Sequence, residues 1–182
     1  RLARACLDYA KTRGGELPAN RRQPATGWNT LVLPFAGREQ LYNEYELSVG
    51  WWEGESNRKV ASERLPELLC PAAPNGARWL ELKTPEGQEF AAAPTDFVAS
   101  AGAYLSDNVA ERLYRGALPQ SGRFYGGSGV TAHRPVRLNE IADGAAHTFL
   151  IVEMADKPNQ RPLPAGSETA DGSEVRELVE GF

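Results

Sequence analysis

The first thirteen residues carry one apolar stripe at helical spacing. Leu2, Cys6 and Tyr9 recur at i, i+4 and i+7, which is the period of an amphipathic helix. Charged side chains occupy the opposite face, and Gly14-Gly15 followed by Pro18 predicts where the helix ends. No Ser, Thr, Asp or Asn precedes the stripe as a cap. We therefore expect this helix to be the distal part of a longer one that begins upstream.

The next segments predict short elements separated by loops. Residues 28–35 form a short apolar run that fits either a strand or an extended entry to a helix. Residues 38–45 place apolar side chains at helical spacing and predict a short helix. Ser56-Asn57 is expected to cap a further helix over 58–63. Residues 68–70 are expected to form a brief strand.

The middle and later parts of the chain are typical of strands. Residues 78–83 alternate apolar with charged side chains, the period of a half-buried strand, and Pro85-Glu86-Gly87 predicts the turn after it. Residues 95–101 are a further strand candidate, while 107–115 fit one or two helical turns. Residues 148–152 are apolar or β-branched without interruption, which predicts a central strand buried on both faces.

The order of these elements predicts an α+β fold: a helix laid across an antiparallel β-sheet, with short inserted helices and long loops. The length of 182 residues suits one domain over 1–182. Residues 156–182 are rich in Pro, Gly, Ser and acidic side chains and predict a loosely packed tail.

Composition excludes several functional classes. The net charge is −4, with both signs scattered along the chain and no basic patch among aromatics, so nucleic-acid binding is not expected. No stretch approaches the roughly 20 apolar residues of a membrane span. Cys6 and Cys70 permit one disulfide, but a buried free thiol suits the apolar stripe equally well. Two cysteines and two distant histidines lack zinc spacing, so we expect no metal and no cofactor.

Several blocks follow one another in a distinctive order. The first helix ends with Tyr9, Gly14 and Pro18, close to the pattern L-x-x-Y-x-x-x-x-G-x-x-P but one residue longer. Later blocks are similar to W-x-x-x-L-L-P-Y with E-Q-x-x-L-Y-N-x-Y, L-P-x-F-L-C-P, T-N-Y-x-x-N-A-G and R-x-x-D-I-T-D-G. Their matching landmarks here are Trp28, Pro34, Leu41, Tyr42, Asn43, Cys70, Pro71, Gly102, Asp143, Gly144 and Glu153.

Together these blocks resemble a bacterial family of prepilin-type, pseudopilin-like envelope proteins that carries a domain of unknown function and an H-x9-D-G C-terminal signature. Arg161 stands where that signature has its His. The resemblance implies a pilin-like fold in which residues 1–13 are the distal part of a stalk helix. It also implies assembly with other pilin-like subunits, as in type II secretion or type IV pili. An upstream apolar helix would serve that assembly and anchor the protein in the membrane at the periplasmic face of the cell envelope.

Few polar residues are candidates for catalysis or for ligand binding. Asp143, with Glu140 and Glu153, fits a ligand contact, but Asp143-Gly144 fits a tight turn before a strand better. His133 and His147 are possible general bases. The Gly-rich stretch beside Ser128 lacks the nucleophile-elbow pattern G-x-S-x-G. We therefore expect no catalytic residues and no enzymatic activity.

Aromatic side chains offer the best candidate binding surface. Trp51 and Trp52 adjoin an acidic residue, and Tyr42 and Tyr45 precede them; such side chains stack on sugars or anchor partners. We expect one tryptophan in the core and the other partly exposed. Two functions follow from the sequence: a non-enzymatic structural subunit of an envelope filament or secretion apparatus, or, alternatively, an envelope-displayed binding module for a glycan or other polymer.

Overall fold

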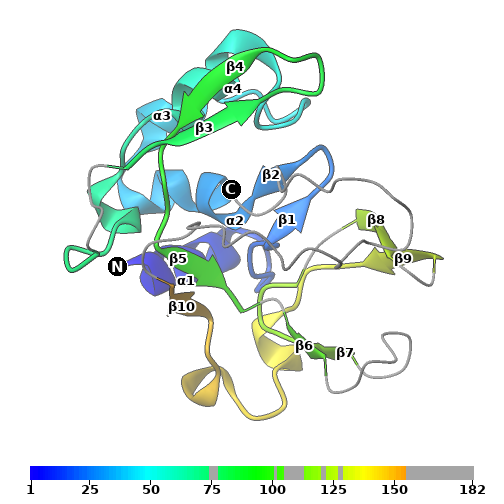
Figure 1. Ribbon diagram of the computed structural model, residues 1–182. Coiled ribbons are helices and arrows are strands. Elements are labelled where there is room, and N and C mark those ends of the chain that lie inside the picture. The colour runs from blue at the N-terminus through cyan, green and yellow to red at the C-terminus, as the bar shows by residue number, and fades with distance from the viewer. Residues whose placement is uncertain (74–77, 101, 105–112, 120–121, 127–128, 155–182) are drawn as a thin grey trace.

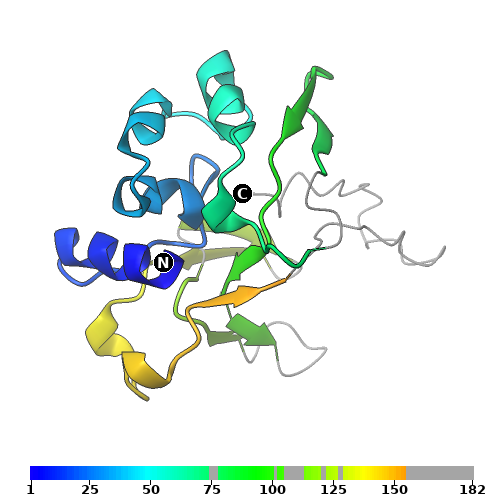
Figure 2. The ribbon, with the colours of Figure 1, turned by 90° about the vertical axis from the view of Figure 1, so that its left-hand side faces the viewer.

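The structure, a computed structural model, describes residues 1–154 with gaps at 74–77, 101, 105–112, 120–121 and 127–128. The fold is a mixed α+β arrangement of short elements (Figure 1). Viewed from the side, the helices α1 to α4 stack on one side of the molecule and most strands lie on the other (Figure 2). The predicted tail over 156–182 lies outside the described residues.

The helical elements are all short. The α-helices are α1 (Leu2–Thr12), α2 (Trp28–Val32), α3 (Glu39–Glu44) and α4 (Gly54–Ala61). The 3-10 turns are η1 (Leu33–Ala36), η2 (Pro66–Leu68), η3 (Leu138–Glu140) and η4 (Ala145–His147).

The described strands form five antiparallel pairs rather than one sheet. The first members are β1 (Arg21–Arg22), β3 (Leu80–Lys83), β5 (Phe97–Ala99), β6 (Gly102–Tyr104) and β8 (Gly122–Gly126). Their respective partners are β2 (Thr26–Gly27), β4 (Glu89–Ala92), β10 (Ile151–Glu153), β7 (Leu113–Arg115) and β9 (Gly129–His133). An isolated two-stranded ribbon is marginally stable in water, so the pairs β1–β2, β3–β4 and β5–β10 depend on their packing against the helical core.

The first helix forms as its spacing predicts. Its apolar stripe is buried, and Asp8 on the outer face accepts charged hydrogen bonds from Arg4 at 2.9 Å and Lys11 at 2.6 Å. The chain leaves the helix through Gly14 and Gly15, whose φ angles of 61° and 88° favour glycine.

The packing of α1 differs from the expected pilin-like arrangement. This eleven-residue helix packs mainly on η1 and α2, and no long helix lies across a sheet in the part of the chain that the structure describes. Its stripe includes the small side chains Ala5, Cys6 and Ala10, which let another helix approach closely. Tyr9 meets Phe35 of η1 edge to face, with ring centroids 5.9 Å apart.

The apolar run over 28–35 is helical, not a strand. All five residues of α2 are buried, and Pro34 lies in the first turn of η1, where its missing N–H costs nothing. Periodicity cannot separate a fully buried helix from a buried strand in so short a run. The helix expected over 38–45 is confirmed as α3.

Two expectations for residues 54–70 are wrong. The helix α4 begins at Gly54, so Ser56 and Asn57 lie inside it rather than at its cap. The strand expected over 68–70 does not form: Leu68 is the last residue of η2, which Pro66 begins with its fixed φ, and residues 69–70 lie in neither a helix nor a strand.

Asn57 is completely buried within α4 and fixes the loop before the helix. Its Oδ1 accepts the N–H of Glu46 at 2.7 Å, and its Nδ2 donates to the carbonyls of Glu46 and Gly50, each at 3.0 Å. One side chain therefore satisfies three backbone groups of this loop.

The strand expected over 78–83 is confirmed in part as β3, and the turn expected after it leads into β4, a strand that the sequence analysis did not predict. Gly87, with φ of 88°, closes the predicted turn by donating its N–H to the carbonyl of Thr84 at 2.8 Å. The strand expected over 95–101 is confirmed in part as β5. Residues 113–115 form β7 instead of the expected helix, and 107–112 lie outside the described residues.

The central strand expected over 148–152 is also wrong. Strand β10 begins only at Ile151 and pairs, among the described strands, with β5 alone. Phe149 is 79% exposed and Val152 38% exposed, so this segment is not buried on both faces. An unbroken apolar run shows only that the side chains are apolar, not that another element covers them.

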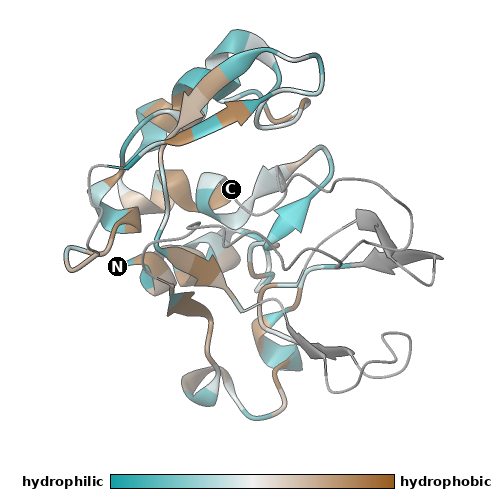
Figure 3. Cartoon of the chain, in the orientation of Figure 1, coloured by the Kyte–Doolittle hydropathy of each residue, from teal (hydrophilic) through white to brown (hydrophobic). Residues whose placement is uncertain are grey.

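The main core joins α1, α2 and α4 with β4 and the loops between them. Hydrophobic positions of α2, β5 and β10 gather toward the middle of the molecule (Figure 3). The buried members of the main core include Leu2, Cys6, Trp28, Val32, Leu33, Tyr45, Trp51, Val60, Leu65 and Leu68. A smaller cluster of Ala10, Leu17, Ala117 and Leu118 lies at the other end of α1.

We predict that Asn57→Ala lowers the free energy of unfolding by about 3 kcal/mol, because buried backbone donors and acceptors lose their partner. The exposed Asn43 of α3 supplies the matched control, and Asn43→Ala should change stability by at most about 0.5 kcal/mol. Urea unfolding followed by circular dichroism measures both. Equal losses in the two variants would contradict the role of Asn57.

Candidate functional site

The four aromatic side chains of the predicted binding surface do not form one exposed cluster. Trp51 is 4% exposed and Tyr45 7% exposed, while Trp52 and Tyr42 are half-buried. The division of the tryptophans into one core and one partly exposed side chain is thus confirmed. A polymer-binding surface built from all four would need Trp51 and Tyr45 to leave the core.

Trp51 connects the loop before α4 to the rest of the core. Its ring meets Trp52 nearly perpendicularly at 5.7 Å and lies 5.8 Å from Phe90 of β4. The backbone N–H of Trp51 donates to the backbone carbonyl of Ala25 at 2.9 Å. Burial raises the pKa of Tyr45, whose hydroxyl lies 3.3 Å from Thr26 Oγ1. These contacts are those of packing side chains.

A buried carboxylate that the sequence analysis missed joins η2, β3, β5 and β10. Asp96 accepts the N–H of Cys70 at 2.7 Å and pairs with the guanidinium of Arg78. Its own N–H donates to the carbonyl of Leu68 at 2.8 Å, and its carbonyl accepts the N–H of Met154 at 2.6 Å. These bonds hold four segments in register, which is a structural role for the charge.

Both cysteines are free and buried, which decides the disulfide question left open by the sequence. Burial raises the pKa of Cys6 to about 12. A hydrogen bond to the carboxylate of Glu153 raises the pKa of the Cys70 thiol. Neither thiol has the lowered pKa of a nucleophilic cysteine.

The acidic residues near Asp143 are not brought together. Asp143 is exposed, and Gly144 (φ 80°) donates its N–H to the carbonyl of Ile141 at 3.0 Å, which confirms a turn. Glu140 instead binds Arg134 through two hydrogen bonds of 2.8 and 2.9 Å, and this pairing lowers its pKa to about 2. Among the described residues, no group of three or more His, Cys, Asp or Glu could hold a metal ion.

The two histidines lie in different elements. His147 is exposed in η4, and His133 ends β9, where its side chain lies outside the description. The structure therefore gives no catalytic geometry for either side chain.

An open groove of about 510 Å³ lies at the first turn of α1. Its apolar wall contains Leu2, Phe97 and Ile151, and at one side Arg38 binds Glu67 through hydrogen bonds of 2.7 and 3.0 Å. The buried stripe of α1 thus begins beside this groove.

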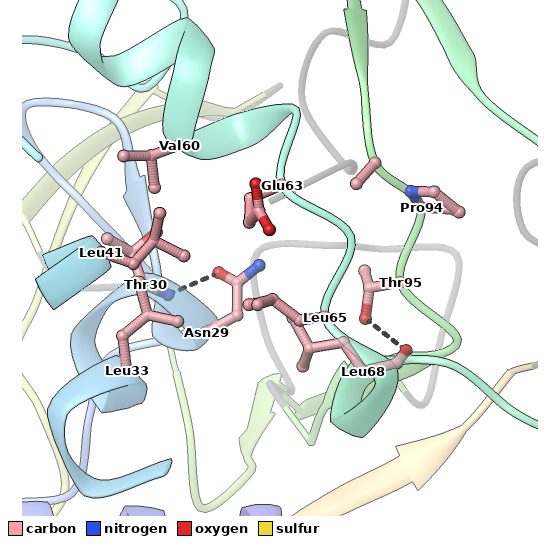
Figure 4. A pocket seen from close by; sticks show the side chains of 11 residues that line it. Asn29, Thr30, Leu33, Leu41, Val60, Glu63, Leu65, Leu68, Pro94 and Thr95 are labelled. Atoms are coloured by element: carbon pink, nitrogen blue, oxygen red, sulfur yellow. Dashed lines mark hydrogen bonds between the residues drawn. The ribbon is translucent and has the colours of Figure 1, made fainter. Parts of the chain in front are cut away.

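A second, much smaller pocket lies between α2, α3, α4 and residues 93–95 (Figure 4). Leu33, Leu41, Val60 and Leu65 form apolar walls, and the amide of Asn29 points into the pocket. Of these two cavities, this pocket is the one in which a buried amide, that of Asn29, points inward. Nothing in the sequence singled it out, because Asn29 lies in an otherwise apolar run.

The landmarks of the sequence blocks are core and turn residues. Tyr9, Trp28 and Cys70 pack in or against the core, while Gly14 and Gly144 occupy positive-φ turn positions. These five landmarks therefore contribute to packing and to turns of the fold.

The comparison with known families identifies the family of this chain. Residues 1–178 match a family described as protein of unknown function, DUF1559, and the chain belongs to this family. No curated protein and no solved structure shows a significant match. In the part of the chain described above, no helix has the length and apolar character needed to cross a membrane.

We predict that Asp96→Asn lowers the free energy of unfolding by about 3 kcal/mol, because it removes one partner of a buried ion pair. The matched control is Glu67→Gln, which breaks the more exposed pair with Arg38 and should cost at most about 1 kcal/mol. Thermal and urea unfolding measure both. A loss no larger for Asp96→Asn than for Glu67→Gln would contradict the role assigned to Asp96.

The raised pKa of Cys6 predicts slow reaction and a particular pH dependence. The thiol should react with alkylating reagents at pH 8 about a thousandfold more slowly than an exposed cysteine, because the thiolate fraction is that much smaller. Stability should be fully present below about pH 9 and fall as pH rises toward 12, since the unfolded thiol ionises first. Urea unfolding between pH 8 and 10.5 measures this fall, which should be weaker in Cys6→Ala. Identical pH profiles would contradict it.

Proposed function

We propose that this chain is the head of a non-enzymatic, pilin-like structural subunit at the bacterial cell envelope. Its partners are other pilin-like subunits, which it contacts through an apolar helix continuous with α1. The observation that carries the proposal is the attachment of α1 to the head. Its apolar stripe is part of the main core from its first turn, while its outer face carries charge.

The groove beside Leu2 supports a helix that enters the head at the first turn of α1. Phe97 and Ile151 extend the apolar surface next to the first turn of α1. An apolar helix entering along this line keeps its buried face in contact with the head. In the full protein, that helix would also provide the membrane anchor and place the head on the periplasmic face. No nucleic acid is involved.

The alternative, a binding module for a glycan or other polymer, finds less support. Trp51 and Tyr45 are committed to the core, which leaves only the half-buried Tyr42 and Trp52 of the four aromatics for such a surface.

We predict that Ala3→Pro distinguishes two cases. In one, the helix begins at the first turn of α1; in the other, α1 is the distal part of a longer helix. Ala3 is exposed and lies in the first turn, where its N–H has no intrahelical acceptor. In the chain of residues 1–182, the substitution should therefore cost at most about 1 kcal/mol. In the full gene product, the same proline would interrupt a continuous helix at a cost of about 3 kcal/mol or more.

The measurement is cross-linking of envelope-assembled subunits in the native bacterium, with Ala3→Gln as the matched control. Ala3→Pro should reduce cross-linked oligomers at least tenfold, while Ala3→Gln leaves them unchanged. Mass mapping of the mature protein accompanies it. A cleaved Gly-Phe-type leader followed by about twenty apolar residues is expected. An ordinary signal peptide, or equal assembly of the two variants, would overturn the proposal.

A further inference from the structure

The hairpin β1–β2 places the cation of Arg22 beside two buried hydroxyl groups. Arg22 is directly opposite Thr26 in the register of the two strands, so both side chains lie on the same face of the hairpin. Thr26 is 1% exposed, and its Oγ1 lies 3.3 Å from the hydroxyl of Tyr45, which belongs to the main core. Arg22 itself is half-buried. A positive charge is therefore held at the margin of the core.

One edge of the Arg22 guanidinium lacks acceptors. Its Nη2 donates to the backbone carbonyl of Leu47 over 3.4 Å, which is long for such a bond. Its Nε is buried and has no hydrogen-bond partner among the described residues. In the same part of the chain, no carboxylate forms an ion pair with Arg22. Buried donors of native proteins are normally paired, so this group requires an acceptor that the described residues do not supply.

The shape of that edge selects a carboxylate. The Nε–H and one Nη2–H of an arginine point the same way from the planar guanidinium, and the two oxygens of a carboxylate match them. The hydroxyls of Thr26 and Tyr45 share one hydrogen bond but carry one hydrogen each. One hydroxyl hydrogen thus remains for a further acceptor on the same face of the hairpin. A carboxylate satisfies this hydrogen together with the two N–H groups.

The nearby charges favour a ligand with one negative charge. Burial raises the pKa of the Tyr9 and Tyr45 hydroxyls, and the positive charge of Arg22 opposes both rises. Arg13, which lies 5.4 Å from the Tyr9 ring centroid, is a second cation, and Glu16 is an anion that acts on the same hydroxyl. These three charges leave a surplus of one positive charge. Water would accept the hydrogen bonds but would leave that charge without a counter-ion.

Access to the edge depends on Leu47. This residue is half-buried in the loop before α4, between Glu46 and Gly50. Asn57 holds the backbone of both those residues through hydrogen bonds of 2.7 to 3.0 Å. The ends of the loop are thus fixed more firmly than its contact with Arg22. The Leu47 carbonyl can turn away from the guanidinium while the ends of the loop keep their bonds.

We propose that the Nε–Nη2 edge of Arg22 is a binding site for a carboxylate, which replaces the long contact with the Leu47 carbonyl. The carboxylate oxygens accept from Nε and Nη2, beside the hydroxyl pair of Thr26 and Tyr45. Either a free carboxylate or an acidic side chain of a second copy of this chain has the required chemistry. The site does not depend on the structural function proposed above.

The test is titration of the ¹⁵N-labelled chain with sodium acetate, sodium sulfate and acetamide at constant ionic strength, at about pH 6. The readout is the Nε–H resonance of Arg22, assigned through its side chain. We expect a saturable shift with acetate, and at least about tenfold weaker binding of doubly charged sulfate and of neutral acetamide. No saturable shift with acetate would mean that Nε meets water only, and would overturn the proposal.

Dilution of the chain without acetate distinguishes the two sources of the carboxylate. An Arg22 Nε–H resonance that moves on dilution supports a carboxylate from a second copy. A resonance that stays in place on dilution and then shifts with acetate supports a free carboxylate.

Two arginine variants make the test specific. Arg22→Lys keeps the positive charge but removes the paired N–H edge, so acetate should bind at least about tenfold more weakly. The backbone N–H resonance of Leu47 reports binding in this variant. Arg13→Lys, at an exposed position that keeps its charge, is the matched control and should leave the acetate affinity within about twofold. Equal acetate affinities of the two variants would overturn the proposal. The titration of the unchanged chain decides it if Arg22→Lys does not fold.

Discussion

The burial of residues 28–33, which form α2 and the start of η1, is the constraint on which the rest of the structure depends. The elements α1, α3 and β2 all pack against α2 or η1. The described strands occur only in pairs, which cannot maintain a fold by themselves. The helical core around this segment therefore carries the strand pairs, rather than a sheet carrying the helices.

Two buried polar side chains then set the positions of segments that the apolar core leaves undetermined. Asn57 fixes the loop that precedes α4, and Asp96 fixes η2, β3, β5 and β10 relative to one another. Apolar contacts are non-directional, whereas these hydrogen bonds define a single register.

The functional surfaces lie at the margins of this framework. The groove beside Leu2 is where the buried stripe of α1 meets the surface, and it relates the head to its proposed assembly. The Asn29 pocket lies between α2, α3 and α4, whose apolar side chains belong to or pack against the main core.

The sequence by itself determined the elements with a clear period. The spacing of Leu2, Cys6 and Tyr9 predicted α1, and alternation of apolar with charged residues predicted β3 and the Pro-Glu-Gly turn after it. These elements are amphipathic, so local order along the chain records which face is buried.

Tertiary structure alone decided the helical state of residues 28–36, the exposure of residues 149 and 152, and the burial of Asp96. A short, mostly apolar run has no clear period, so its structure depends on what covers it. A polar side chain is buried only if partners arrive from elsewhere, and those of Asp96 lie as far as 26 residues away. The Asn29 pocket has the same origin, because its walls come from segments that meet only in the folded chain.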